Sequence, residues 1–448
     1  MPPTHSVIVI GAGISGLACA YRLKKRGCDV LALEASDFPG GMIRSVEENG
    51  YLFETGPQSF STTAQLNELI DDLGLASELV TAPAKAPRYI LVNGELRTVP
   101  LSPGSFLASS LLSWATKFSI LREPFSKSVP PEDDESIAAF VRRKFTPELM
   151  ELLVGPFVSG IYAGDPEKIS LRTAFPTIHE AEKTAGSIVR GMKGATKNRT
   201  GQRVKSTLVS FRHGNQALPD ALAAKLGDSL RIGVQVSAIA RASDRRFAVT
   251  STAGQFDAEH VVLATPTNVA AELLRPIAEA AASALSQIEY APVAVVSLGF
   301  SEADVARNLD GFGFLVPRTA GIRTLGTIWN SSLFPNRSDH GDVLVTSFLG
   351  GATDPEAIRL SDEALVEQAS KDVDAPLELI LGPQISKVSK YPRAIPQYNL
   401  GHTTRLAAIA EDLAKIPGLY LTGNYLNGPS IGACVEHAQS VAESIRIS

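Results

Sequence analysis

Cysteine is scarce in this sequence, and no long hydrophobic run is present. The three cysteines, Cys19, Cys28 and Cys434, form no CxxC pair and are odd in number, which argues against a disulfide framework and predicts a reducing compartment. No uninterrupted apolar run reaches the roughly 20 residues needed to span a bilayer. A strand pattern follows Met1 almost at once, without a basic and then apolar leader, so we expect a cytoplasmic protein rather than a secreted one.

Excess positive charge and metal-binding motifs are also lacking. The formal net charge is −5, so a nucleic-acid partner has no electrostatic support. The seven histidines form no HExxH motif and no close cluster, and His179-Glu180 lacks a second histidine, so no metal site is expected. What the sequence does contain is an ordinary globular composition, 44% hydrophobic and 20% charged over 448 residues, which suffices for two or three domains.

Residues 6–34 carry the clearest functional signal. A β-branched apolar run leads into Gly11, Gly13 and Gly16, a helical pattern follows, and a second strand pattern ends on Glu34. This order predicts a strand, a phosphate-binding turn, a helix, a strand and an acid for the ribose, as a dinucleotide requires. Gly11 permits the tight turn, Gly13 lets the backbone approach the pyrophosphate, and Gly16 allows helix and strand to pack closely. Glu34 favours a free ribose hydroxyl, so NADP is not expected.

A second glycine pair distinguishes FAD from NAD. Gly40-Gly41 comes just after the acid-bearing strand, and residues 50–57 read as a strand that runs into a Gly-Pro turn. A glycine pair alone is as often a plain turn. Its position here favours a second approach to a pyrophosphate, and therefore a long cofactor whose flavin reaches past the switch point of the sheet. The sequence predicts FAD as the cofactor.

The nucleotide-binding pattern returns in the middle and at the end of the chain, which indicates one domain interrupted by another. The predicted fold class is α/β: an FAD/NAD(P)-binding Rossmann-like domain with an α+β substrate domain and a helical insertion. The predicted parts are an FAD-binding domain (residues 1–85, 207–266 and 401–448), a substrate-binding domain (residues 86–99 and 267–400) and a helical insertion (residues 100–206).

Local patterns predict individual elements. Residues 86–97 read as a β-hairpin that turns at Asn93-Gly94, and residues 230–236 read as one strand. Residues 190–206 are basic and glycine-rich, as in an exposed loop. A helix is expected from about Gly432, and its positive N-terminal end would stabilise the anionic reduced flavin.

Residues 428–432 match the GxSxG elbow of serine hydrolases. Such an enzyme needs an acid and then a histidine after the serine, and only Glu436 and His437 follow as an ordered pair. Adjacent residues on one helix point in different directions, so they cannot both serve Ser430. A hydrolase is therefore rejected.

Further segments carry a resemblance to a known family. They are Phe157–Pro166, Arg323–Trp329, Ala394–Tyr398 with Gly401-His402, and Gly423–Gly432. In this order they resemble the flavin amine-oxidase superfamily over nearly the whole chain, and within it the members that oxidise porphyrinogens. The resemblance implies that non-covalent FAD oxidises a porphyrinogen to a porphyrin in three two-electron steps, each of which reduces O2 to peroxide. We name no catalytic acid or base, because the cofactor carries the chemistry and the protein orients and desolvates the substrate.

By matching motifs, the resemblance also implies which residues hold FAD. Val236 would contact the adenine through its backbone, and Met42 departs from the larger aromatic residue that some relatives carry there. The implied cofactor residues are Gly11, Ala12, Gly13, Ile14, Ser15, Gly16, Glu34, Ala35, Met42, Gly56, Pro57, Gln58, Ser59, Val236, Asn424, Pro429, Ser430 and Ile431.

For the substrate, the candidates are Arg88, Leu315 and Trp329. The bidentate fork of Arg88 suits a propionate. A surface arginine is the commoner case, but the Ala-Pro-Arg context resembles the family's propionate-binding site. Leu315 and Trp329 either sandwich the macrocycle or belong to the hydrophobic core. Residues 100–122 either form a core helix or make peripheral contact with a membrane, as the matching region of the family does.

Other functions stay open on the sequence. A flavin amine oxidase is the closest rival, although no Ser-Gly-Gly-Cys segment for a covalent flavin is present. A carotenoid desaturase is a weaker rival, and a flavin-binding scaffold without turnover is a third. Protoporphyrinogen IX and coproporphyrinogen III differ in vinyl against propionate groups, so the number of cations around the pocket decides between them. The electron acceptor and the oligomeric state, a homodimer included, are left open.

Overall fold

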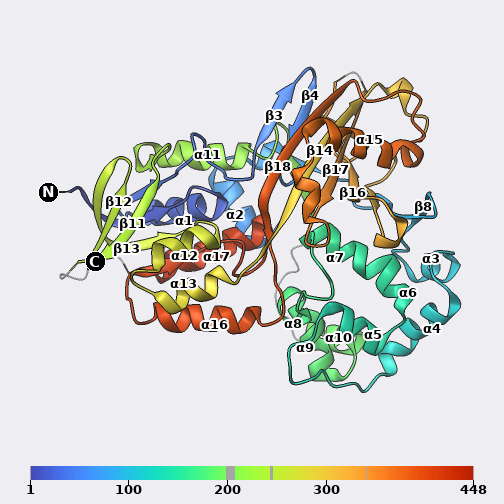
Figure 1. Cartoon of the computed structure of the whole chain (residues 1–448), viewed down its shortest axis with the longest axis horizontal. Coiled ribbons are helices and arrows are strands. Elements are labelled where there is room, and N and C mark those ends of the chain that lie inside the picture. The colour runs from blue at the N-terminus through green and yellow to red at the C-terminus, as the bar shows by residue number, and fades with distance from the viewer. Residues whose placement is uncertain (1, 198–206, 243–245, 340, 447–448) are drawn as a thin grey trace.

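The structure of the chain is a computed structural model, and it describes residues 2–197, 207–242, 246–339 and 341–446. Figure 1 shows three parts: a nucleotide-binding sheet with its helices, a second sheet beside it, and a group of helices below the second sheet. The blue N-terminal segments of the first part lie among yellow-green and red segments, so this part is assembled from distant pieces of the chain.

The nucleotide-binding part is built on a seven-stranded sheet. Its strands run in the order β10 (Leu230–Arg231), β2 (Val30–Leu33), β1 (Thr4–Ile10), β13 (Gly254–Leu263), β12 (Phe247–Ser251) and β11 (Val236–Arg241), and β19 (Leu419–Leu421) pairs with β13. The pairs from β10 to β13 and the pair β13–β19 are parallel, whereas β12 pairs antiparallel with both its neighbours. Residues 7–10 of β1 are all buried, as expected where a parallel sheet is covered on both faces.

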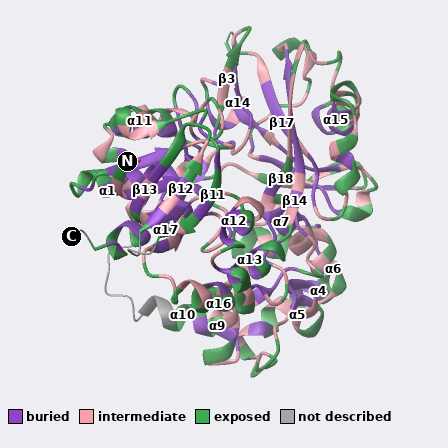
Figure 2. Ribbon diagram, turned by 60° about the vertical axis from the view of Figure 1, so that its left-hand side comes forward, coloured by how far each residue is buried: buried purple, intermediate pink, exposed green. Residues whose placement is uncertain are grey.

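Helices cover both faces of this sheet. One face carries α1 (Ile14–Lys25), α2 (Ala64–Asp72), α11 (Ala217–Leu226) and α17 (Ile431–Ser444), and the other carries α12 (Thr267–Leu274), α13 (Glu279–Ser286) and α16 (His402–Leu413). Alternation along β1 divides the core, since Val7 and Val9 pack with the first group and Ile8 and Ile10 with the second. Figure 2 shows the buried strands in purple between helices with green, exposed outer sides.

Helices α12 and α13 correct the predicted domain boundary at residue 266. The prediction assigns them to the substrate-binding domain, but Ala270, Leu274 and Leu285 pack them onto the nucleotide-binding sheet. The sequence pattern does not reveal this, because an apolar helix face can pack on the sheet before it or on the sheet after it.

The second sheet is also seven-stranded. Its order is β18 (Ile385–Pro396), β14 (Tyr290–Phe300), β17 (Val343–Gly350), β16 (Thr324–Trp329), β15 (Gly313–Leu315), β7 (Arg88–Val92) and β8 (Glu95–Thr98), and α15 (Asp362–Leu377) covers one face. Neighbours are antiparallel except β15 and β7. The hairpin β7–β8 turns at Asn93 and Gly94 as predicted, and their φ angles of 53° and 79° are those of a type I′ turn.

Short elements complete the two sheet regions, and two local predictions fail. β3 (Ser45–Glu48) pairs with β4 (Tyr51–Glu54), β9 (Leu208–Phe211) lies between β5 (Phe60–Ser61) and β6 (Leu79–Thr81), and α14 (Asn330–Leu333) follows β16. The predicted strand 230–236 is broken at Gly233, whose φ of 69° separates β10 from β11. The predicted loop 190–206 begins as helix α10 (Ile188–Lys197), and residues 198–206 lie outside the described residues.

The insertion is helical, as predicted. It contains α3 (Pro103–Ala108), α4 (Trp114–Arg122), α5 (Ile137–Lys144), α6 (Pro147–Leu149), α7 (Gly155–Tyr162), α8 (Leu171–Ala174), α9 (Pro176–Ala185) and α10. The buried ammonium of Lys144 lies 3.3 Å from Glu123 and 3.1 Å from Glu182 and so joins three of its segments. Burial opposes ionisation of Glu182, but hydrogen bonds from Arg143, Ser128 and Lys144 lower its pKa to about 2. No helix in the described part of the chain is long and apolar enough to cross a membrane.

A buried ion pair fastens β4 to the loop after α14. The Arg337 guanidinium lies 3.1 Å from a carboxylate oxygen of Glu54, and both side chains are almost completely buried. Arg337 also donates to Ser210 and to the Phe211 carbonyl, and Glu54 accepts from Ser45 and from the Asn215 amide. Burial raises the pKa of Glu54, and the arginine opposes that rise. The buried Glu54 carboxylate therefore needs Arg337 to remain charged at this position.

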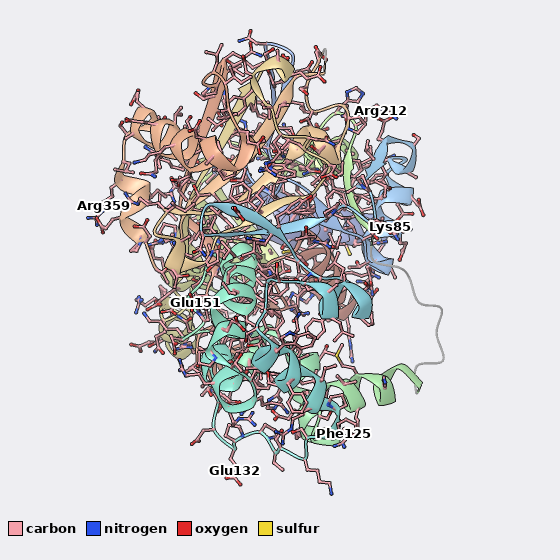
Figure 3. All side chains as sticks on the ribbon, turned by 90° about the vertical axis from the view of Figure 1, so that its right-hand side faces the viewer. Lys85, Phe125, Glu132, Glu151, Arg212 and Arg359 are labelled. Atoms are coloured by element: carbon pink, nitrogen blue, oxygen red, sulfur yellow. The ribbon has the colours of Figure 1, made fainter. Side chains whose placement is uncertain are left out.

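We expect Arg337→Ala to destabilise the protein strongly, because it leaves the Glu54 carboxylate buried without a counter-charge; the loss is about 3–5 kcal/mol. The readout is the midpoint of thermal unfolding. Arg359→Ala is the control, since Arg359 pairs with Glu356 at the surface, at the edge of the molecule in Figure 3, where such a pair contributes at most about 1 kcal/mol. Equal midpoints for the two variants would contradict the role given to the buried pair.

Candidate cofactor and substrate site

A cleft of about 440 Å³ opens at the carboxyl ends of β1 and β2, where open α/β sheets bind their ligands. The predicted cofactor residues that line it are Gly11, Gly13, Ile14, Ser15, Glu34, Ala35, Met42, Pro57, Val236, Asn424, Pro429 and Ile431. The predicted residues outside the lining are Ala12, Gly16, Gly56, Gln58, Ser59 and Ser430. The fold therefore brings most of the predicted set together from three distant segments.

The glycine turn shows a separate role for each glycine. Gly11 has a φ of 98°, which side chains rarely adopt, and leads from β1 into the turn. A Cβ on Gly16 would lie 1.9 Å from the Gly11 carbonyl oxygen and 3.0 Å from the Ala264 Cβ, so α1 packs directly on the strand ends. A Cβ on Gly13 would meet no protein atom within 4 Å and would project into the open cleft.

Glu34 stands at the end of β2 with its carboxylate fixed. One oxygen accepts the Ala12 amide at 2.6 Å, and the other accepts the amide and hydroxyl of Ser36 at 2.9 and 2.8 Å. These donors hold the carboxylate in the cleft and leave lone pairs for ribose hydroxyls.

The second glycine pair lies against the phosphate turn. The Gly40 amide donates to the Ala12 carbonyl at 2.8 Å, and Gly13 and Gly40 form an isolated parallel bridge. Gly40 and Gly41 have φ angles of 107° and 63° and both line the cleft. They were singled out from the sequence, and their backbone conformation explains why glycine stands there.

Three of the predicted residues that do not line the cleft stabilise the segments around it, namely Gly56, Gln58 and Ser430. A Cβ on Gly56 would lie 2.0 Å from the Met42 carbonyl oxygen, so the loop before Pro57 packs tightly on the loop that carries Met42. Gln58 is buried and donates to the Glu54 and Gly56 carbonyls. The Ser430 hydroxyl accepts a hydrogen bond from the Ala433 amide at 3.2 Å, so Ser430 is the N-cap residue of α17.

The cleft fits FAD. No side chain caps the N-terminus of α1, so its first-turn amides are open to a pyrophosphate. Thr265 lines the cleft, and its buried hydroxyl has no partner among the described residues. Cys434 also lines the cleft, but burial raises the pKa of its thiol to about 11, so it stays protonated near neutral pH and is a poor nucleophile. A non-covalent cofactor agrees with that chemistry.

Sequence reasoning missed part of the lining. Ala264, Thr265 and Pro266 follow the parallel strand β13, and their position at a strand end could have indicated them. Tyr290 and Arg393 reach the cleft from β14 and β18 of the second sheet. Nothing local marks these two, because only the packing of one sheet beside the other brings them there.

A second cavity, of about 620 Å³, lies between the second sheet and the helical insertion. Its walls include Leu315 on β15, Phe348 on β17 and Phe157 on α7, with Leu153 from a π-helical turn at Met150–Val154. Arg88 is the one charged residue among the described residues that line it. Arg88 is exposed, and its Cζ lies 5.3 Å from the centroid of the Phe312 ring. Among the described residues, its guanidinium forms no ion pair with a carboxylate.

Trp329 is a correction to the predicted substrate set. Its side chain is 1% exposed and packs in the core of the second sheet, with its ring centroid 5.4 Å from that of Tyr89. It does not line the cavity, so it belongs to the core, which the sequence left as the alternative. The preceding residues of β16, Leu325 to Ile328, line the cavity, and Trp329 at the end of the strand turns into the core, which the sequence does not reveal.

The cleft and the cavity approach each other along two strands. On β18, Ala394 lines the cleft and the next residue, Ile395, lines the cavity. On β14, Tyr290 lines the cleft and Val293 lines the cavity. The cleft and the cavity therefore adjoin each other along β14 and β18.

Comparison with known proteins gives four further findings. Residues 14–446 match the family described as flavin containing amine oxidoreductase. The chloroplastic protoporphyrinogen oxidase of Nicotiana tabacum is 37% identical over 467 residues, which cover 98% of this chain and 85% of that protein. The coproporphyrinogen III oxidase of Bacillus subtilis (strain 168) is 28% identical over 455 residues, with 97% and 96% covered. The crystal structure of a candidate protoporphyrinogen oxidase from Exiguobacterium sp. 255-15 has a TM-score of 0.83 and 27% identity, covering 99% of this chain and 98% of that one.

Two alanine variants separate cofactor contact from packing. We expect Gly13→Ala to leave the stability of the cofactor-free protein unchanged but to weaken FAD binding about tenfold or more, ~1.4 kcal/mol, because its methyl group enters the space of the pyrophosphate. Gly16→Ala should instead lower the stability of the cofactor-free protein by about 1–3 kcal/mol through overpacking. FAD titration and thermal unfolding give the two readouts.

The control is Gly104→Ala, where a Cβ would meet nothing within 4 Å, far in the sequence from the glycine turn. It should leave FAD affinity unchanged, and because Gly104 lies in α3 it should raise stability by at most about 1 kcal/mol rather than lower it. Equal FAD affinity in Gly13→Ala and the parent protein would show that the Gly13 backbone does not approach the cofactor.

Proposed function

The chain belongs to the family of flavin containing amine oxidoreductases and is an FAD-dependent oxidase, and we propose that it oxidises protoporphyrinogen IX to protoporphyrin IX in haem biosynthesis. The family match confirms the resemblance seen in the sequence. Porphyrinogen names are carried by the tobacco and Bacillus relatives alike. In this proposal six hydrogens leave the substrate in three two-electron oxidations, and three molecules of O2 take them up as three molecules of peroxide; bound FAD would supply the redox chemistry.

The composition of the cavity wall supports protoporphyrinogen IX as the substrate. The macrocycle is apolar apart from its pyrrole nitrogens, and the cavity offers it aliphatic and aromatic walls. Protoporphyrinogen IX has two propionates, whereas coproporphyrinogen III has four spread around the ring. A single guanidinium, Arg88, suits the first arrangement, since further carboxylates against apolar walls would have to give up water without a partner. Coproporphyrinogen III, the substrate named for the Bacillus relative, is the second candidate.

In this proposal the chain's own residues orient the porphyrinogen and remove water from around it. The fork of Arg88 holds one propionate at the rim, and Leu315 and Phe348 keep the ring in a dry cavity. FAD supplies the electron acceptor when it is bound. The N-terminus of α17 reaches the cleft at Ile431, and its partial positive charge would favour negative charge on a cofactor bound there. No protein acid or base is required by this arrangement.

We also propose that the insertion contacts a membrane at its surface. Trp114, Phe118, Leu121 and Phe125 recur at helical spacing along α4 and the turn after it, and each is exposed, from 48% for Leu121 to 81% for Phe125. Figure 3 shows Phe125 at the lower edge of the insertion. Such a stripe is not a core helix, and large aromatic side chains on one exposed face are typical of an interfacial helix.

Side-by-side oxidation of protoporphyrinogen IX and coproporphyrinogen III, followed by porphyrin fluorescence, tests the function. We expect the protein to prefer protoporphyrinogen IX, and Arg88→Ala to raise its KM about tenfold, because the variant loses a charge-assisted hydrogen bond of about 1.5–3 kcal/mol. Arg97→Ala is the matched control, since Arg97 lies on the same hairpin but pairs with Glu95 outside the cavity.

Two outcomes would count against this assignment. Faster oxidation of coproporphyrinogen III would make the second candidate the function. Turnover of amines without oxidation of either porphyrinogen would assign the chain to amine oxidation.

The membrane proposal is tested by sedimentation with phospholipid vesicles. We expect Phe118→Ser combined with Phe125→Ser to reduce the bound fraction about tenfold or more, because each exposed aromatic ring that enters the lipid contributes roughly 1–3 kcal/mol. The control is Ile380→Ser combined with Leu381→Ser, two exposed apolar residues outside the insertion. Equal loss in both double variants, or no binding by the parent protein, would contradict a docking face on α4.

A further inference from the structure

The segment that follows β18 touches both halves of the site without lining either. Gln397, Tyr398 and His402 are 3%, 2% and 0% exposed, and none of them lines the cleft or the cavity. They belong to the Ala394–Tyr398 and Gly401-His402 segments that carried part of the family resemblance. Their role is therefore not explained by contact with the cofactor or the substrate.

Two of these side chains hold the turn that follows β19. The Tyr398 hydroxyl donates to the Asn424 carbonyl, and the His402 Nε2 lies 2.9 Å from the Tyr425 carbonyl. A carbonyl can only accept, so Nε2 of His402 carries the proton. Burial lowers the pKa of His402, which agrees with a neutral ring near pH 7. Asn424 lines the cofactor cleft, so both hydrogen bonds end on the backbone of a cofactor-lining turn.

The same segment is fastened to the cavity. Gln397 donates from its side-chain amide to the Tyr162 carbonyl at 2.9 Å, at the end of α7, which lines the cavity through Phe157 and Ile161. The three rings are in contact in a row, with centroids 5.8 Å apart in an edge-on pair between Tyr162 and Tyr398 and 4.6 Å apart in a tilted pair between Tyr398 and His402. One rigid segment thus touches the cavity helix on one side and the cofactor turn on the other.

We propose that Tyr398 and His402 are positioning residues that fix the Asn424–Tyr425 turn against the flavin and set its distance from the substrate cavity. They act through the two carbonyl groups and do not touch the cofactor. The inference depends on bound FAD and not on which porphyrinogen is oxidised. Loss of either donor leaves a buried carbonyl without a partner, which costs about 1–3 kcal/mol, a factor of roughly 5 to 150 in an equilibrium.

The test compares His402→Leu with His402→Gln. Leucine fills the space without a donor, whereas the amide nitrogen of glutamine can take the place of Nε2 and donate to the same carbonyl. We expect His402→Leu to weaken FAD binding about tenfold and to change the visible absorption spectrum and midpoint potential of the bound flavin, and His402→Gln to restore all three. Tyr398→Phe, which removes only one hydroxyl, provides a second variant with the same expected direction should His402→Leu fail to fold.

The control is His260→Leu. His260 is partly buried, its ring packs against that of a tyrosine, Tyr420, with centroids 5.9 Å apart, and it lies outside the cleft. It should lower thermal stability without moving the flavin potential.

Three results would overturn the proposal. One is an unchanged flavin potential, spectrum and FAD affinity in His402→Leu and Tyr398→Phe. Another is equal impairment in His402→Leu and His402→Gln, and the last is a shift of the potential by His260→Leu as large as that by His402→Leu. Because the readouts are properties of the flavin, failure of the porphyrinogen assays would leave this test intact.

Discussion

A backbone contact without room for a side chain determines where the cofactor cleft lies. At Gly16 helix α1 packs directly on the Gly11 carbonyl and on Ala264, so the ends of β1 and β13 and the N-terminus of α1 converge at one point. The turn between them has its amides open to an anion because the helix lacks a side-chain cap. Gly40 and Glu34 then attach to the same short turn, through the carbonyl and the amide of Ala12. One close approach therefore organises the phosphate turn, the second glycine pair and the ribose acid together.

The second sheet is joined to this arrangement through strands that serve both spaces. β14 and β18 each line the cleft near one end and the cavity a few residues away. The relative position of the cleft and the cavity is thus set by two paired strands rather than by flexible loops. The buried pair of Arg337 and Glu54 fixes the loop before Pro57 in the same manner, since Asn215 bonds to both Glu54 and the Pro57 carbonyl. Charged and polar groups are thus buried at places where two parts of the fold must keep a fixed relative position.

The features predicted well from the sequence are those encoded within a few residues. The glycine turn, Glu34 and the Asn93-Gly94 hairpin each follow from backbone rules that act over short distances, and the structure shows each of them in its expected conformation. Arg393 and Tyr290 could not be predicted, because they reach the cleft only through packing between sheets. Trp329 was predicted wrongly because the composition of a strand shows that one face is buried but not against what. The boundary at residue 266 failed for the same reason, since α12 and α13 carry apolar faces that either sheet could bury.

The proposed function uses no acid or base from the protein, and the distribution of charge around the site agrees with that. Where the cleft must meet negative charge, it offers the N-termini of α1 and α17 rather than a row of basic side chains. The cavity is almost wholly apolar and has one guanidinium at its edge. In the proposed function, selectivity comes from desolvation, because each carboxylate beyond those that Arg88 can hold would have to lose water to enter the cavity. Such a site would reject a ligand through the carboxylates that it leaves unpaired, and this penalty is larger than the gain from any one added contact.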